Sequence, residues 1–237
     1  MIQAAASLAH IVASYFVRYI MQRTITDYVS GSRLIERVAK LALFGAADDG
    51  GINRQALTEV EFDARRFLAS SAQAFDCKAF QDPAGNMFFR REGIENCAPV
   101  LTGSHIDTQP SGGKLDGAFG VCAGLEVLAA LHDMRAVTRR PIEVVIWANE
   151  EGCRFVPGSM GSAAFVEPTR LGDFRSVLDA RGVSFGECID RMHDELSEIQ
   201  VRDLQFEVKV FIEAHIEQGP VLEHARVPIG VVTGIQG

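Results

Sequence analysis

Three short apolar segments constrain the fold of this chain more than any other feature of its sequence. They are rich in β-branched residues, and each ends in side chains that can do chemistry: APVLTGSHID (98–107), RRPIEVVIWANEEG (139–152) and LQFEVKVFIEAHIEQG (204–219). Apolar runs of this length, bounded by turn-forming residues, predict buried β-strands. In the third run Val208, Val210 and Ile212 lie two residues apart, so we expect them to share one face of a strand.

The segment between the first two runs has the period of a helix. In GAFGVCAGLEVLAALHDM (117–134) the apolar residues Val121, Leu125, Leu128 and Leu131 recur at a spacing of three to four. Strand, helix and strand in succession predict a βαβ unit, whose two strands are parallel. Because parallel strands end at the same edge of the sheet, the polar residues that follow them should converge there.

The rest of the chain from residue 30 predicts helices and one hairpin. Residues 30–44 read as a helix, and residues 56–75 read as a second helix in which Thr58 and Glu61 have the spacing of a capping box. Residues 77–93 read as two short strands around the turn signal Asp82-Pro83-Ala84-Gly85-Asn86. The predicted fold class is therefore α/β, with a mostly parallel sheet flanked by helices.

Residues 1–29 are interpreted as a separate amino-terminal extension. The stretch IQAAASLAHIVASYFVRYIM (2–21) is apolar, but Arg18 lies near its end, whereas a secretory signal carries its basic residues at the start. Helical spacing of Leu8, Val12, Tyr15 and Tyr19 favours an amphipathic helix over a membrane span. A start of translation at Met21 is the other interpretation, and it would leave the segment without a role.

Composition bears on the partner, the core and the cellular compartment of the protein. The chain has 237 residues and a formal charge of −8, with 23 basic and 31 acidic residues and no basic stripe, so nucleic acid is not expected as a partner. Its 47% hydrophobic content is enough for a substantial core. The five cysteines are scattered without a CxxC pair, which favours free thiols in a cytoplasmic protein.

The first two polar clusters follow the first predicted strand. His105 and Asp107 lie two apart, so their side chains should sit side by side, as when a carboxylate orients a metal-binding imidazole. Asp116 lies in a glycine-rich turn that leads into the helix. Taken alone, a histidine and an aspartate two apart at a strand end more often form a surface hydrogen bond, and Asp116 alone favours a helix N-cap.

The other two clusters follow the second and third predicted strands. Side chains of the neighbours Glu150 and Glu151 diverge, so one carboxylate can coordinate a metal while the other faces an attacking water; a solvated acidic loop is the alternative. His215 by itself fits a buried core histidine. Together, however, two histidines and three carboxylates at one sheet edge form a nitrogen and oxygen donor set suited to zinc, and less to cobalt or manganese.

These residues fall in segments that resemble a known family. TGSHIDTQPSGGKLDGAFGVCAGLEVL, WANEEGCRFVPGSMGSAAF and EAHIEQGPVLEHARVPIGVVTGIQG are similar to the amidohydrolases that include N-carbamoyl-L-amino acid hydrolase, allantoate amidohydrolase and β-ureidopropionase, relatives of di-zinc aminoacylases and carboxypeptidases. Weaker similarity extends the match to about residues 30–237. The resemblance implies a zinc-peptidase-like catalytic domain, with a separate lid and dimerisation domain in the family.

The resemblance also implies a role for each candidate residue. His105, Asp116 and His215 would hold one zinc ion, and Asp116 would bridge to a second zinc ion that Glu151 also binds. Glu150 would be the general base, Asp107 would orient His105, and Gln218 would help hold the substrate. Two divalent ions are thus expected in a complete site, Zn²⁺ first and Mn²⁺ or Co²⁺ next.

The same comparison predicts that residues 30–237 form only the amino-terminal part of the catalytic domain. The chain ends where the family's lid domain would begin, so the lid, the last histidine ligand and the residues that grip the substrate carboxylate would lie beyond it. We expect a small-molecule carbamoyl or ureido substrate and a homodimer for the full-length family, while this chain alone should turn over little. A related di-zinc peptidase, a non-catalytic metal-binding chain and a thiol enzyme using Cys122 or Cys153 are the alternatives.

Overall fold

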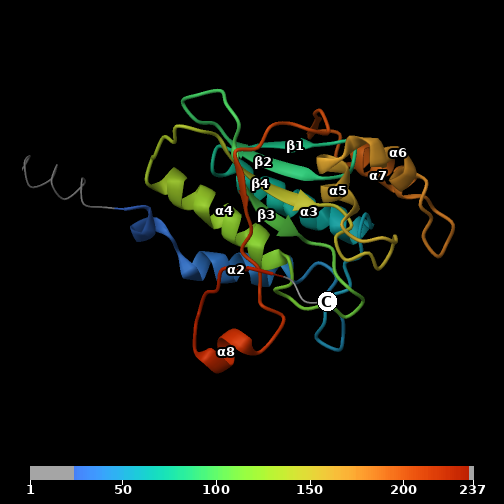
Figure 1. Ribbon diagram of the computed structural model, residues 1–237, viewed down its shortest axis with the longest axis horizontal. Coiled ribbons are helices and arrows are strands. Elements are labelled where there is room, and N and C mark those ends of the chain that lie inside the picture. Colours follow the sequence, from blue (N-terminus) through green and yellow to red (C-terminus); the bar gives the residue numbers. More distant parts are fainter. Residues whose placement is uncertain (1–23, 235–237) are drawn as a thin grey trace, which may run out of the picture.

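The computed structural model describes residues 24–234 and contains a sheet of six strands in the order β5-β1-β2-β4-β3-β6 (Figure 1). The strands are β1 (Lys78–Gln81), β2 (Met87–Arg91), β3 (Val100–His105), β4 (Ile142–Trp147), β5 (Gln200–Val201) and β6 (Val210–Ile212). The pairs β3–β4, β3–β6 and β1–β5 are parallel, whereas β2 runs antiparallel to both β1 and β4. The sheet is therefore mixed, and it is parallel where the candidate residues lie.

Helices cover the sheet and extend beyond its ends. They are η1 (Ile25–Tyr28), α2 (Gly31–Leu41), α3 (Glu59–Gln73), α4 (Ala118–Asp133), α5 (Met160–Val166), η2 (Pro168–Arg170), α6 (Leu171–Arg175), α7 (Phe185–Glu195) and α8 (Val221–Ala225). Helices α3 and α4 pack on the sheet, and α2 packs against α4. The short helix α8 stands away from this body on the carboxyl-terminal segment (Figure 1).

Strand β4 shows why an apolar run without alternation is buried on both faces of a sheet. Val144 and Ile146 pack with α3 and α4 in the larger core, while Val145 and Trp147 pack with Phe165 of α5 in the smaller one. All but the first residue of the strand are buried. A strand in this position is mostly apolar because neither of its faces meets water, and its one charged residue, Glu143, is buried in ion pairs with Arg90 and Arg202.

The predicted elements are confirmed, with two corrections. The third apolar run forms only the short strand β6, which begins after Val208, and its residues are exposed because β6 lies at the edge of the sheet. Ser30 caps α2 by accepting from Arg33 N at 3.2 Å, and the β1–β2 hairpin and the β3-α4-β4 unit form as expected. Thr58 accepts from Glu61 N at 3.4 Å, which is one bond of the predicted capping box. The other predicted bond, from Thr58 N to the Glu61 carboxylate, does not form. The Glu61 carboxylate instead accepts from Leu57 N and pairs with Arg65, because both groups are buried in the core.

The predicted helix in residues 2–21 lies outside the described residues. Within residues 24–234, no helix is long and apolar enough to cross a membrane. The division of the chain at residue 30 stays a prediction.

Candidate metal centre

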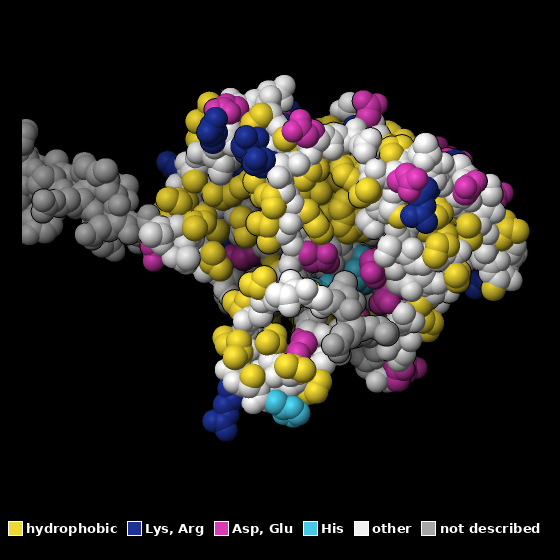
Figure 2. Space-filling model, in the orientation of Figure 1, with side chains coloured by type: hydrophobic (Ala, Val, Ile, Leu, Met, Phe, Trp, Pro, Cys, Tyr) yellow, Lys and Arg dark blue, Asp and Glu magenta, His cyan; other side chains and the backbone are white. Residues whose placement is uncertain are grey.

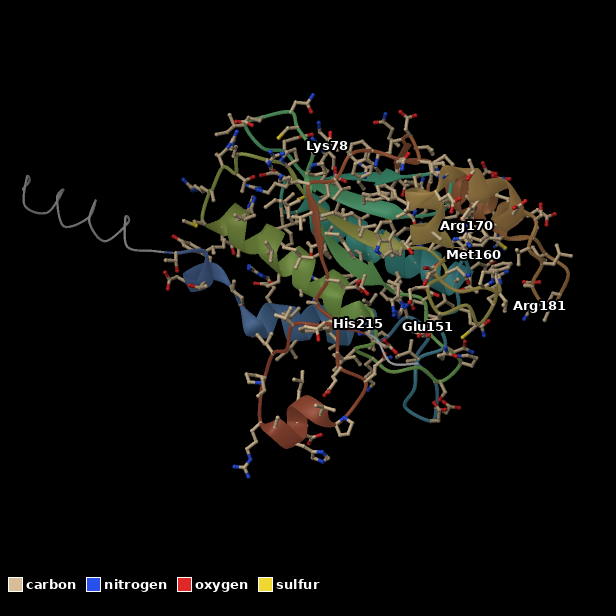
Figure 3. All side chains as sticks on the ribbon, in the orientation of Figure 1. Lys78, Glu151, Met160, Arg170, Arg181 and His215 are labelled. Atoms are coloured by element: carbon tan, nitrogen blue, oxygen red, sulfur yellow. The ribbon has the colours of Figure 1, made fainter. Side chains whose placement is uncertain are left out.

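Three predicted ligands converge at the edge where the parallel strands end. His105 is the last residue of β3, Asp116 lies just before α4, and His215 follows β6. One side-chain donor atom from each lies within 4.8 Å of the others. Figure 3 shows His215 and Glu151 on the same side of the molecule, and Figure 2 shows histidine and acidic side chains gathered in a recess above α8.

Hydrogen bonds determine which nitrogen each histidine offers. Nδ1 of His105 lies 2.9 Å from the Asp107 carbonyl oxygen, and Nδ1 of His215 lies 2.9 Å from the Ile216 carbonyl oxygen. Because a carbonyl oxygen only accepts, Nδ1 must carry the hydrogen in both rings. In the neutral rings the lone pair is then on Nε2, and both Nε2 atoms face carboxylates: Glu150 at 3.3 Å and Asp116 at 3.4 Å.

A glycine makes the approach of α4 to His105 possible. Gly117, the N-cap of α4, has φ of 59°, and a Cβ placed there would lie 2.4 Å from Nε2 of His105. Any larger residue would therefore occupy the position of the imidazole. Asp116 precedes this cap, so its side chain is not used as the N-cap and remains available to the cluster.

Asp107 plays a different part from the one that its spacing suggests. Its backbone carbonyl, rather than its carboxylate, contacts His105 Nδ1 at hydrogen-bond distance; the nearest carboxylate oxygen is 3.6 Å away. The carboxylate accepts from the backbone N–H groups of Glu150 at 3.2 Å and Glu151 at 3.1 Å. Asp107 thus ties the segment after β3 to the segment after β4.

The two glutamates diverge as predicted. The Glu150 carboxylate faces His105, and its pKa is raised by partial burial, with further upward shifts from Asp107, Glu151 and Asp116 that the charge of His105 opposes. The Glu151 carboxylate turns away and accepts from Gln109 Nε2 at 2.7 Å, and it is not in the three-residue cluster. Only one of the two side chains therefore faces the imidazole.

Gln218 also lies at the site. Its Nε2 donates to Asp116 Oδ2 at 2.6 Å, while Asp116 Oδ1 faces His215. One carboxylate oxygen of Asp116 thus belongs to the cluster and the other is held by an amide. That arrangement matches a carboxylate able to serve two neighbouring positions.

The donor set fits a divalent metal ion such as zinc. Two imidazole Nε2 atoms and one carboxylate oxygen give three protein donors, which is the usual number for a catalytic zinc site with an open position. His105 Nε2 lies 3.3 Å from Glu150 and His215 Nε2 lies 3.4 Å from Asp116; both distances are longer than hydrogen bonds of good geometry, so neither Nε2 atom has a strong hydrogen-bond partner among these carboxylates.

Cysteine chemistry finds no support in the geometry. Cys122 is fully buried in α4, and burial raises the pKa of its thiol to about 12. Cys153 is exposed, but its sulfur contacts Gln109 Oε1 at 2.7 Å, and no histidine contact is found for it among the described residues. Neither thiol is arranged as an activated nucleophile.

Several residues that support the site were not found by sequence reasoning. Arg54 donates to the carbonyl of Ile106, between His105 and Asp107, and Ser104 of β3 donates to Glu213, two residues before His215. Asn149 adopts φ of 51° and its amide donates to Phe155 and Pro157 oxygens, folding back the loop that carries Glu150. The charged Glu213, directly after the apolar residues of β6, is a signal in the sequence that could have indicated such a role.

Comparison with known proteins confirms the resemblance. The model of the peptidase family M20/M25/M40 matches residues 101–234, more than half of the chain. An N-carbamoyl-L-amino-acid amidohydrolase of Rhizobium meliloti is 38% identical over 213 residues, covering 88% of this chain and 50% of that protein. An allantoate amidohydrolase of Bacillus subtilis is 33% identical, covering 92% of this chain and 50% of that protein.

Solved structures agree with the sequence relatives. A hydantoinase/carbamoylase family amidase from Burkholderia ambifaria superposes with a TM-score of 0.79 at 42% identity, covering 84% of this chain and 48% of that one. The chain spans about half the length of the curated relatives it matches. By this match and by its α/β fold, the chain belongs to the peptidase family M20/M25/M40.

Proposed function

We propose that the chain carries the metal-binding part of an amidohydrolase that cleaves a linear amide or carbamoyl C–N bond in a small molecule. The observation that carries this proposal is the convergence of His105, Asp116 and His215 with the Glu150 carboxylate directly beside them. The names of the relatives support N-carbamoyl amino acids, allantoate or similar ureido compounds as the substrate class.

The residues divide the chemistry between them. A divalent ion, Zn²⁺ in our proposal, supplies Lewis acidity that makes water a nucleophile at neutral pH and polarises the carbonyl group. Glu150 accepts the proton of the attacking water and passes it to the leaving nitrogen, a role worth typically about 10² to 10⁴-fold. For an N-carbamoyl amino acid the products are the free amino acid, carbon dioxide and ammonia.

The remaining residues place these groups. Asp107 holds the backbone of Glu150 and Glu151, so that Glu150 faces the site. Asp116 and Glu151 are our proposed ligands for a second ion, with Asp116 shared; Glu151 would have to leave Gln109 to serve it. Gln218, which now contacts Asp116, is placed to hold the substrate. We also propose a cytoplasmic location, with which the five free cysteines are compatible.

Metal content tests the site itself. We expect the purified chain to bind zinc, and the double variant His105→Ala/His215→Ala to lose that metal. The matched control is His132→Ala/His224→Ala, which removes two histidines outside the cluster. Equal metal content in the cluster variant and the wild type would contradict the assignment.

The reaction is tested by ammonia release from carbamoyl and ureido compounds, and by release of a free amino acid from N-acetyl amino acids and dipeptides, which yield no ammonia. The substrates are N-carbamoyl amino acids, allantoate and ureidopropionate, with N-acetyl amino acids and dipeptides as competitors. They are offered to the chain alone and to a chimera that adds the second half of the Rhizobium meliloti relative. We expect the chimera to prefer carbamoyl or ureido compounds and to lose turnover in Glu150→Gln. Preference for dipeptides would place the chain with the peptidases instead.

A further inference from the structure

We propose that Arg54 is a positioning residue for the metal centre. Its buried guanidinium holds the backbone between His105 and Asp107, and so fixes both the His105 imidazole and the loop that carries Glu150 and Glu151. The inference rests on the proposed metal site, but it concerns a residue that lies outside the cluster and touches none of the three ligands.

Arg54 is almost completely buried, at 1% exposure, and its donors are aimed at backbone oxygens. Nε donates to Ile106 O at 2.8 Å, while Nη1 donates to Leu41 O at 2.9 Å and to Phe44 O at 2.7 Å. Leu41 is the last residue of α2. The guanidinium therefore joins the end of that helix to the peptide that follows the ligand His105.

The backbone of Arg54 strengthens the same connection. Arg54 N donates to the Thr108 hydroxyl and Thr108 N donates to Arg54 O, both at 2.9 Å. The Thr108 hydroxyl in turn donates to Ile52 O at 2.9 Å. Residues 52–54 and 106–108 are thus fastened by side-chain and backbone hydrogen bonds, and none of these bonds reaches solvent because Ile52, Ile106 and Thr108 are buried.

The site receives this constraint through Asp107. Its carbonyl contacts His105 Nδ1, and its carboxylate accepts from the backbone of Glu150 and Glu151. A shift of the segment 106–108 would therefore turn the imidazole and release the loop that carries both glutamates. The chain of contacts runs from α2 through Arg54 and Asp107 to the proposed base.

The electrostatics show that Arg54 is not placed for an ordinary ion pair. Among the described residues no carboxylate lies within ion-pair distance of it, and the charges of Glu61 and Asp107 act on it only from farther away. Carbonyls at a helix carboxyl terminus carry partial negative charge, which suits a cation. A buried cation held mainly by carbonyls is costly, so the position calls for a function beyond stability.

Lysine cannot reproduce this contact. The guanidinium uses two different nitrogens, Nε and Nη1, to reach carbonyls on two separate segments. An ammonium group is a single point that would have to abandon one of them. Arg54→Lys thus keeps the charge and removes the bridge.

Arg65 provides a matched control. It is also fully buried at 0% exposure, and it donates to Gly85 O at 2.8 Å and to Glu61 at 2.9 Å, and within residues 24–234 it makes no hydrogen bond or ion pair to residues 105–108. Arg65→Lys should lower the midpoint of unfolding, as should Arg54→Lys. Only the Arg54 variant should disturb the site.

The experiment measures two properties of the whole chain under conditions where circular dichroism shows each variant folded. The first is Zn²⁺ affinity by competition with a chelator: we expect a loss of about 10 to 100-fold in Arg54→Lys, typical for residues that orient metal ligands, and less than about twofold in Arg65→Lys. The second, on metal-free protein, is amide hydrogen exchange at Thr108, Glu150 and Glu151, which should be faster only in the Arg54 variant.

Thr108→Val keeps the test decisive if Arg54→Lys does not fold. It removes the hydroxyl that joins Arg54 N to Ile52 O while nearly preserving shape, and it should weaken zinc affinity and amide protection in the same direction. A wild-type chain that binds no zinc would refute the proposed function, and amide exchange would still decide the role of Arg54. Unchanged amide exchange at Glu150 and Glu151 in both Arg54→Lys and Thr108→Val would overturn the inference.

Discussion

The carboxylate of Asp107 accepts a hydrogen bond from the backbone N–H of Glu150 at 3.2 Å, and it accepts a second one from the next residue at 3.1 Å. These bonds connect the ends of β3 and β4, two parallel strands that are neighbours in the sheet. The position of the proposed base therefore depends on a carboxylate far from it in the sequence, and not only on the loop that carries it.

Asp107→Asn is expected to loosen the glutamate loop. An amide can accept from one N–H but presents NH₂ to the other, so one partly buried donor loses its partner, at a cost of about 1 kcal/mol or more in the free energy of unfolding. Zinc affinity should fall as well. Urea unfolding and metal titration measure the two effects.

Asp179→Asn is the control, because Asp179 also accepts from two backbone N–H groups, those of Arg181 and Val183, and it pairs with Arg154 at 3.1 Å. We expect a loss of stability there too, from the broken ion pair, but unchanged zinc affinity. If Asp107→Asn also left zinc affinity unchanged, Asp107 would have no special part in the site.

Exchange of each glutamate for glutamine should separate their roles. In the chimera with a complete second half, Glu150→Gln should retain metal and lose turnover by about 10² to 10⁴-fold, because the amide cannot accept the proton of water. Glu151→Gln should reduce the second equivalent of metal instead. Metal analysis and ammonia release on the same preparations distinguish the two, and near-normal rates in both variants would show that the division is wrong.

Stability of the metal-free chain should depend on the protonation of His105. Burial lowers the pKa of this imidazole, but the neighbouring carboxylates of Asp107 and Glu150 outweigh it and raise the pKa to about 9 from an ordinary value of 6.5. The folded state therefore holds the proton more tightly than the unfolded state. The resulting stabilisation is fully present below pH 6.5 and is lost as the pH rises through 9.

Urea unfolding of the metal-free protein below pH 6.5 and at pH 9 tests this dependence. The free energy of unfolding should fall with rising pH in the wild type and fall less in His105→Gln. A variant that keeps the full pH dependence would assign it to another group. Zinc should also bind more tightly as the pH rises, because the ion must displace this proton.

Gly117→Ala should damage the site through space and not through charge. The new Cβ would lie 2.4 Å from His105 Nε2, and φ of 59° is unfavourable for alanine, so both the imidazole and the start of α4 must shift. We expect zinc binding to be lost and the unfolding midpoint to fall. Gly113→Ala, with only Asp116 Cβ nearby at 3.9 Å, is the control and should leave both nearly unchanged.

The sequence by itself determined the elements and the identity of the proposed ligands. The period of apolar residues predicted β3, α4 and β4, because burial on a helix or strand face repeats with the geometry of that element. The same succession predicted parallel strands, and parallel strands end at one edge. Hence His105, Asp116 and His215 could be expected to meet, as the structure shows.

Only the tertiary structure decided how these side chains are held. The bond from Arg54 to Ile106 O, the turn of Glu151 toward Gln109 and the antiparallel placement of β2 each join segments whose separation in the chain carries no periodic signal. Thr58 and Glu61 show the same limit at short range. The Glu61 carboxylate pairs with the buried Arg65 and does not complete the predicted capping box. Hydrogen-bond partners are chosen by what packing brings within about 3 Å, and that is a property of the folded chain and not of any local pattern.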